Sequence, residues 1–129
     1  MMTKKYTFDS VPSLVENEGK TILVRFVEEE RKVEVDGKEM TVYDGYSIRI
    51  NQPVSRDKVI DAIVSEAYPT DKMQAIINNH FANLAKIADG KKLDADDEEH
   101  EAEYNAMQDW RTKAKAVAKD VLEEYIRTH

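Results

Sequence analysis

The stretch that decides the fold is residues 21–51, "TILVRFVEEERKVEVDGKEMTVYDGYSIRIN". It is rich in β-branched and aromatic residues, and the pair Asp36-Gly37 lies almost at its midpoint. An Asp-Gly pair adopts the positive φ angles of a tight hairpin turn, and strands of similar length are expected on its two sides. The stretch therefore predicts a long antiparallel β-hairpin, with strands at about 22–35 and 39–50.

Apolar and polar residues alternate in both arms of this hairpin, which indicates a ribbon with one buried face. The residues of that face are Ile22, Val24 and Phe26 in the first arm and Tyr46, Ile48 and Ile50 in the second. The middle of the stretch, "EEERKVEVDGKEM", is much more polar, so we expect the tip to project into water or toward a partner. The pair Asp44-Gly45 predicts either a β-bulge or a turn that splits the second strand. Because a two-stranded ribbon is marginal alone, residues 5–10, "KYTFDS", are a candidate third strand.

The apolar period then changes from that of a strand to that of a helix. Ser55 is a good N-cap for a helix over about 56–68. A second helix is predicted over about 71–88, with Thr70 as its cap and Asp89-Gly90 at its end. The apolar side of this second helix consists of Met73, Ile76, Ile77, His80, Phe81 and Leu84. Two helices joined so closely predict a helical hairpin or corner.

Residues 96–127 contain neither proline nor glycine, so we expect one helix of roughly 48 Å at 1.5 Å per residue. A compact chain of 129 residues is only about 36 Å across, so this helix overshoots its own domain. Either its acidic first turns protrude or fray, or another chain packs along it. Its stripe is broader than a coiled-coil seam, which favours packing on the two preceding helices; the stripe consists of Tyr104, Met107, Trp110, Ala114, Val117, Ala118, Val121, Leu122 and Tyr125.

These elements predict an α+β fold in a single domain over residues 1–129. Residues 1–51 form its β-ribbon part and residues 52–129 its helical part.

Charge and composition narrow the classes of partner. The chain has 26 acidic and 19 basic residues, and its formal net charge of -7 opposes binding to nucleic acid. No apolar run reaches the roughly 18 residues of a membrane span, so we expect neither a nucleic-acid nor a membrane partner. The absence of cysteine excludes disulfides and thiolate chemistry and fits a cytoplasmic location.

Residues 93–104, "LDADDEEHEAEY", hold seven carboxylates around one histidine and are the first candidate for chemistry. Asp96, His100 and Glu103 share a helix face at i, i+4 and i+7, which is a weak metal-ligand set. The spacing of a calcium-binding EF-hand loop, of a paired di-iron site and of a zinc protease is absent. We favour the interpretation as a solvated acidic helix start, whose carboxylates suit the helix dipole, and keep a charged docking surface and a metal site as alternatives.

No nucleotide-binding loop and no hydrolase motif occurs, so we expect no enzyme activity and no cofactor. His80 lies on the apolar side of its helix and is interpreted as a partly buried residue with one or two hydrogen bonds. Trp110 is interpreted first as a packing anchor and otherwise as a partner contact.

Two stretches of the helical part, "AIVSEAYPTDKMQAIINNH" and "EAEYNAMQDWRTKAKAVAKDVL", resemble small proteins carried in phage and prophage tail regions. Tail-fibre assembly chaperones similarly close with a Trp-Arg-bearing helix after an acidic stretch. The resemblance covers residues 53–125 and leaves the β-hairpin unmatched. It implies a non-enzymatic accessory protein that binds another virion or tail protein.

The leading hypothesis is a non-enzymatic interaction or assembly protein, cytoplasmic or, if phage-derived, virion-associated. It would engage another protein or a second copy through the hairpin tip or the acidic end of the last helix, with Asp36, Gly37, Tyr104 and Trp110 as candidate contacts. The first alternative is an acidic mimic of nucleic acid that inhibits a basic protein. The second is a small metal-binding or enzymatic domain built on His80 or His100.

Overall fold

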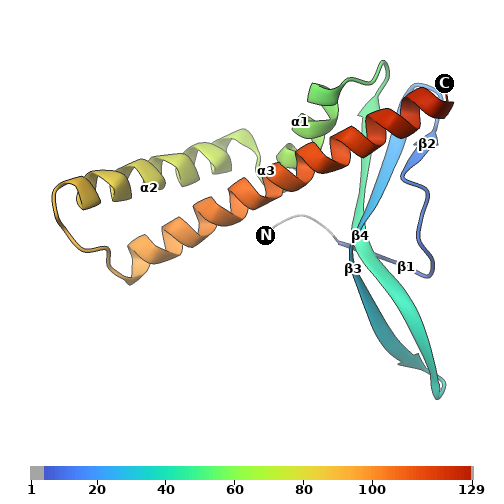
Figure 1. Cartoon of the computed structure of the whole chain (residues 1–129), viewed down its shortest axis with the longest axis horizontal. Coiled ribbons are helices and arrows are strands. Elements are labelled where there is room, and N and C mark those ends of the chain that lie inside the picture. Colours follow the sequence, from blue (N-terminus) through green and yellow to red (C-terminus); the bar gives the residue numbers. More distant parts are fainter. Residues whose placement is uncertain (1–4, 129) are drawn as a thin grey trace.

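The computed structural model describes residues 5–128, which form an antiparallel four-stranded sheet followed by three helices (Figure 1). The strands are β1 (Tyr6–Phe8), β2 (Val15–Asn17), β3 (Thr21–Val35) and β4 (Lys38–Asn51). The helices are α1 (Arg56–Ala67), α2 (Thr70–Ala88) and α3 (Ala95–Thr128). The α+β prediction is confirmed, and both strands of the hairpin and all three helices begin and end within one residue of their expected limits.

The sheet is built around the predicted hairpin, in the order β1-β4-β3-β2. Asp36 and Gly37 have φ angles of 52° and 78°, so both take the positive values that a two-residue hairpin turn needs. The candidate strand in residues 5–10 is β1, which pairs antiparallel with β4. Strand β2, which pairs with β3, was not predicted because its three residues carry no strand pattern of their own.

A β-bulge interrupts the pairing of the two long strands. Val27 pairs with Gly45 and Glu29 pairs with Asp44, so Glu28 has no opposite residue. The Asp44-Gly45 pair therefore marks a bulge and does not split β4, but the extra residue lies on the partner strand. Beyond the bulge the hairpin continues as a polar ribbon that extends past the helices to its tip (Figure 1).

Polar side chains tie three strands together beside the bulge. Arg31 on β3 donates from Nε to Asp44 Oδ2 at 2.6 Å, and the Thr7 hydroxyl on β1 donates to Asp44 Oδ1 at 2.7 Å. The hydrogen bond from Arg31 is the main reason why the pKa of Asp44 is held below its usual range. This carboxylate thus has partners although its residue is buried.

The core lies between the inward face of the sheet, α1 and the second half of α3. All six alternating strand residues predicted to face inward are buried. Trp110 from α3 packs edge-on to Tyr46, with ring centroids 4.9 Å apart, and donates from Nε1 to the Ile63 carbonyl of α1 at 2.9 Å. The bond satisfies the one polar atom of this buried ring, so Trp110 anchors sheet and helices to one another.

Two of the predicted helix limits have the expected chemistry and one does not. Ser55 caps α1 by accepting a hydrogen bond from the Lys58 amide, and Gly90, with φ of 74°, follows the end of α2. The prediction that Thr70 caps α2 is wrong, because Thr70 is already the first helical residue. Pro69 occupies the cap position with extended backbone, so no side chain caps this helix.

Helix α3 has 34 residues and overshoots the sheet, as its length predicted. Its second half packs on α1 and the core, whereas its first half and α2 extend together away from the sheet (Figure 1). We call this extension, residues 70–109, the helical arm, and the remainder the body. None of the helices within residues 5–128 has the length and apolar character needed to span a bilayer.

Candidate interaction surface on the helical arm

The first contact that holds the arm together lies at its outer end. Asp94 directly precedes α3 and exchanges two hydrogen bonds with Asp97. The Asp97 amide donates to Asp94 Oδ1, and the Asp94 amide donates to Asp97 Oδ2. This is a capping box that satisfies free amides of the helix start. Lys86 of α2 adds bonds from Nζ to both Asp97 oxygens at 2.7 and 2.8 Å, and this partner is the main cause of the lowered pKa of Asp97.

The second contact lies about one turn further along α3, at Glu101, and is also polar. The Nδ1 atom of His80 lies 2.9 and 3.0 Å from the two oxygens of Glu101. Asn83, which is 1% exposed, donates to Glu101 Oε2 and to the backbone carbonyl of Asp97. The His80 ring stacks on Tyr104 with centroids 3.7 Å apart, and the bond to His80 lowers the pKa of Glu101. We call these contacts between α2 and α3 the polar seam.

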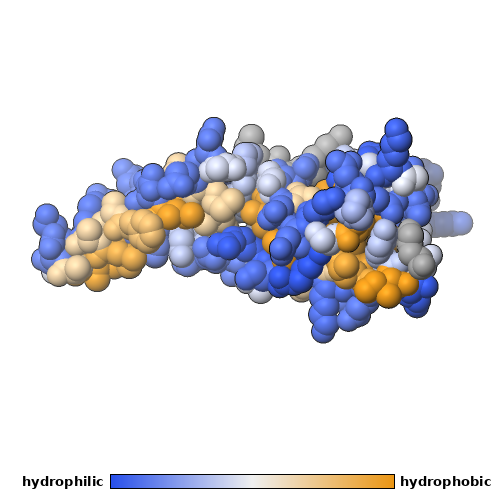
Figure 2. All heavy atoms as spheres, turned by 90° about the horizontal axis from the view of Figure 1, so that it is seen from above, coloured by the Kyte–Doolittle hydropathy of each residue, from blue (hydrophilic) through white to orange (hydrophobic). Residues whose placement is uncertain are grey.

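The seam is polar, and the apolar side of α2 divides into two parts. Met73, Ile76 and Ile77 pack on the core, whereas the apolar residues nearer the end of the helix are left exposed. Ile76 is buried at 3% exposure, but Phe81 is 61%, Leu84 46% and Ile87 55% exposed. We call the surface formed by Phe81, Leu84, Ile87 and half-buried Ile77 the apolar arm face. Figure 2 shows it as an orange strip along the end of the molecule that α2 forms. Exposed apolar side chains gathered on one helix are a feature of interaction surfaces.

The arm also carries most of the net charge of the protein. Residues 70–109 contain ten acidic and four basic side chains, a formal charge of −6 out of the total of -7. Among the exposed carboxylates are Glu98, Glu99 and Glu103 of α3, the main neighbour of α2. The arm as a whole is therefore strongly acidic, and most of its carboxylates lie at the start of α3.

The second half of α3 carries a groove in which basic residues outnumber acidic ones. Its volume is about 370 Å³, and it is lined by Arg56, Lys115, Ala118, Lys119, Leu122, Glu123 and Ile126. Three of these seven residues are basic and one is acidic, while Ile126 is 71% exposed. We call it the basic groove.

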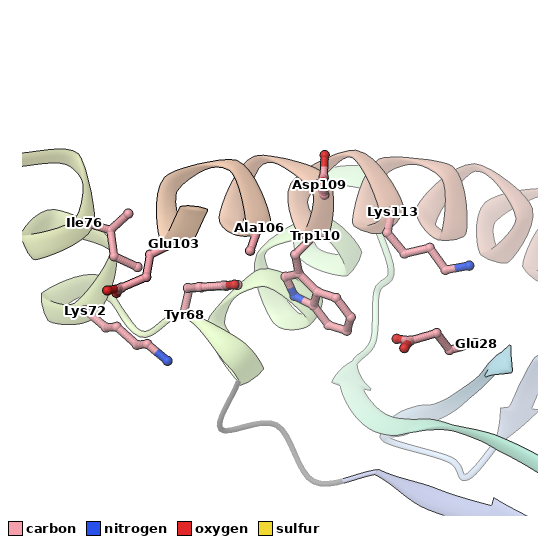
Figure 3. A pocket seen from close by; sticks show the side chains of 9 residues that line it. All are labelled: Glu28, Tyr68, Lys72, Ile76, Glu103, Ala106, Asp109, Trp110 and Lys113. Carbon is pink, nitrogen blue, oxygen red and sulfur yellow. The ribbon is translucent and has the colours of Figure 1, made fainter. Parts of the chain in front are cut away.

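A larger pocket of about 620 Å³ lies where the arm joins the body (Figure 3). Its lining comes from all parts of the fold: Glu28, Tyr68, Lys72, Ile76, Glu103, Ala106, Asp109, Trp110 and Lys113. Figure 3 shows the rings of Tyr68 and Trp110 in its middle, with charged side chains at both ends. Among residues 5–128, no serine, threonine, cysteine or histidine is in the lining, so this part of the chain brings no nucleophile–histidine pair of hydrolases to the pocket.

Two tyrosines near this pocket are held in their neutral form. Burial is the main cause that raises the pKa of Tyr68, and the negative charge of Glu103 adds to it. Burial raises the pKa of Tyr46 to about 12, with a further contribution from a hydrogen bond with the bulge residue Glu28. The bulge thus turns a carboxylate toward the aromatic cluster of the core.

The structure places the residues predicted for function in different surroundings. Asp96 and Glu103 are exposed and His100 is half-buried, and within residues 5–128 no group of three or more histidine or acidic side chains is arranged to hold a metal ion. The four residues predicted as partner contacts are also far from equivalent. Asp36 and Gly37 at the hairpin tip are exposed, Trp110 is buried in the core, and half-buried Tyr104 lies in the polar seam. His80 has the partly buried, hydrogen-bonded role that was predicted.

Sequence reasoning missed the apolar arm face because it assigned Phe81 and Leu84 to a buried side of the second helix. A signal was present: His80, Asn83 and Lys86 recur at helical spacing, and carboxylates recur in the same way at the start of α3. Two complementary polar stripes on adjacent helices predict a polar contact, which leaves the apolar stripe of α2 for another partner.

Comparison of the chain with models of protein families, with curated proteins and with solved structures finds no match.

Proposed function

We propose that this protein is a non-enzymatic interaction protein, an accessory or assembly factor that acts by binding another protein chain through its helical arm. The observation that carries the proposal is the apolar arm face. Burying an exposed Phe, Leu or Ile side chain is favourable by about 1.5–3 kcal/mol, and the fold leaves three of them on one helix largely uncovered. Binding of a partner supplies that burial.

The polar seam supports the same proposal. Hydrogen bonds and ion pairs join α2 to α3, so the arm keeps its shape without using Phe81, Leu84 or Ile87. A preformed surface loses less conformational entropy on binding than a disordered one. The resemblance of residues 53–125 to phage tail-region proteins adds a virion or tail protein as the partner class, which tail genes on both sides of this gene would support and metabolic genes would contradict.

The test compares Phe81→Asp with Val11→Asp, which places the same charge at an apolar residue of the body that is 65% exposed. Proteins captured by the wild type are purified and titrated calorimetrically against the wild type and both variants. We expect the arm variant to bind at least about tenfold more weakly. Equal affinities for the two variants would contradict a binding role for the arm.

The acidic mimic of nucleic acid is the second candidate, and the charge of −6 on the arm favours it. Such binding is dominated by charge, so it weakens steeply with salt. The probe is a purified basic DNA-binding protein, titrated between about 50 and 300 mM salt. Affinity that does not change over this range, or that survives Glu98→Gln with Glu99→Gln, argues against this candidate.

A further inference from the structure

The α3 residues of the polar seam and of the basic groove lie on one continuous face of this helix. Asp97, Glu101 and Tyr104 face α2 through the polar seam. Continuing at steps of three or four residues, the same face passes through Arg111 and Lys115 to the basic groove at Leu122 and Ile126. Helix α2 thus covers the first part of this face and leaves the second part open to another helix.

The chain's own arm cannot fill its own groove. Phe81 follows directly on His80, which contacts Glu101, whereas Ile126 lies 25 residues further along α3. At 1.5 Å per residue, that separation is about 38 Å along one uninterrupted helix. A helix that fills the groove would therefore come from a separate molecule.

The charge and the apolar lining of the groove indicate which kind of helix would bind there. The groove is lined by apolar Ala118, Leu122 and Ile126, by basic Arg56, Lys115 and Lys119, and by acidic Glu123. Helix α3 from residue 110 to 128 has five basic and three acidic residues. It fits a helical segment of net negative charge that presents exposed apolar side chains. The helical arm has these properties, with exposed Phe81, Leu84 and Ile87 and a charge of −6.

We propose that a second copy of this chain docks its apolar arm face into the basic groove, and that the exchange is reciprocal. A two-fold axis perpendicular to α3 sets the two α3 helices antiparallel, which brings the acidic half of each beside the basic half of the other. Both arms are then bound in one closed, isologous dimer, so no arm is left to extend a filament. The inference rests on the proposed function, because it needs the arm to be an interaction surface.

The first experiment measures the mass of the full chain by light scattering after size exclusion and by sedimentation velocity. We expect about 30 kDa, twice the 14.8 kDa of one chain, with a dissociation constant that rises with salt. Phe81→Glu in the arm and Ile126→Glu in the groove should each weaken association at least about tenfold. Val11→Glu, at an exposed apolar residue outside both surfaces, should leave it unchanged.

Mixing the two variants tests the reciprocal geometry. A mixed dimer joins the intact arm of Ile126→Glu to the intact groove of Phe81→Glu, so we expect hetero-association that neither variant shows alone. The charge contribution is tested with Lys115→Glu and Lys119→Glu together, which should weaken the wild-type dimer and be rescued by Glu98→Lys with Glu99→Lys. Circular dichroism checks that every variant is folded.

Several results would overturn the inference: a wild-type monomer throughout the micromolar range, a dimer indifferent to both arm and groove variants, or no complementation on mixing. These experiments also distinguish failure of the self-association proposal from failure of the proposed function. A monomer whose binding to another protein is lost with Phe81→Glu removes only the self-association. If Phe81→Glu changes neither the mass nor the binding of any protein, both proposals fail.

Discussion

At Gly45 the two long strands approach too closely for any side chain on that residue. A Cβ atom there would lie 2.1 Å from the Phe26 carbonyl oxygen and 2.9 Å from the Val27 Cα, both backbone atoms that cannot move aside. The close approach accompanies the bulge at Glu28, whose carboxylate bonds Tyr46 and forms an ion pair with Lys5 at 3.1 Å. The absence of a side chain at Gly45 thus permits the bulge that positions the carboxylate of Glu28.

Gly45→Ala should therefore destabilise the protein by on the order of 1–3 kcal/mol, because the strands must separate to admit the methyl group. Urea unfolding monitored by circular dichroism measures the change. The matched control is Ser47→Ala on the same strand, which should stay within about 0.5 kcal/mol of wild type. A Gly45→Ala protein as stable as the control would mean that the strands are not held this closely.

At the scale of the element, α2 has two faces with different roles. Its buried residues Ile76 and Asn83 contact the rest of the fold, while Phe81, Leu84 and Ile87 are exposed. The stability of the protein and its binding should therefore depend on different residues of the same helix.

We expect Ile76→Ala to lower the free energy of unfolding toward the lower end of about 2–5 kcal/mol, because it removes a buried side chain beside an open pocket. In monomeric protein, Phe81→Ala should change it by no more than about 0.5 kcal/mol, since that ring is mostly in water. Thermal and urea unfolding of both variants give the comparison. A large loss of stability in Phe81→Ala would show that the arm face is buried by this chain itself.

The polar seam should make the arm sensitive to acid. The pKa values of Asp97 and Glu101 are lowered from 3.8 and 4.5 by their partners Lys86 and His80. A carboxyl with a lowered folded pKa stabilises the fold above its unfolded pKa, and this contribution is lost as pH falls through the folded value. Stability should therefore fall below about pH 4.

The measurement is the free energy of unfolding by urea at pH 7 and at several values below pH 4.5. Asp97→Asn should be less stable at pH 7 and lose less on acidification, because one of the linked carboxyls is gone. Asp61→Asn, at an exposed residue of α1, should follow the wild-type profile. If Asp97→Asn also follows it, the carboxylate does not hold the arm.

For the whole molecule, the body and the arm differ in what stabilises them. The body buries a continuous core between the sheet, α1 and α3, whereas α2 adds few buried side chains and a set of polar contacts. Regions with few buried apolar contacts open at lower free energy than the core. The arm should therefore open locally without unfolding of the body.

Native-state hydrogen exchange tests this difference. Amides in the second half of α2, residues 80–88, should exchange at least about tenfold faster than those of the buried α1 segment, residues 59–64. Phe81→Glu should leave this ratio unchanged in monomeric protein, and association of two chains should slow exchange in α2 most. Uniform protection across α1 and α2 would instead indicate one cooperative unit.

Most of the local structure was determined by the sequence itself. Alternating residues such as Ile22, Val24 and Phe26 predicted the buried sheet face, and Asp36-Gly37 predicted the turn, because these signals act between near neighbours in the chain. The absence of helix breakers likewise predicted the length of α3. Of the candidate site, the sequence predicted the acidic start of α3 and its overshoot but not the apolar arm face.

Only the tertiary structure decided which side of each helix or strand is covered by another part of the chain. Periodicity places Ile76 and Phe81 on the apolar part of one helix, but the His80–Glu101 and Lys86–Asp97 contacts rotate that helix so that Ile76 is buried and Phe81 is not. Short β2 and the bulge at Glu28 likewise depend on strands distant in the chain. A helical or strand period shows that a face exists, whereas the long-range contacts of its neighbours determine what, if anything, covers it.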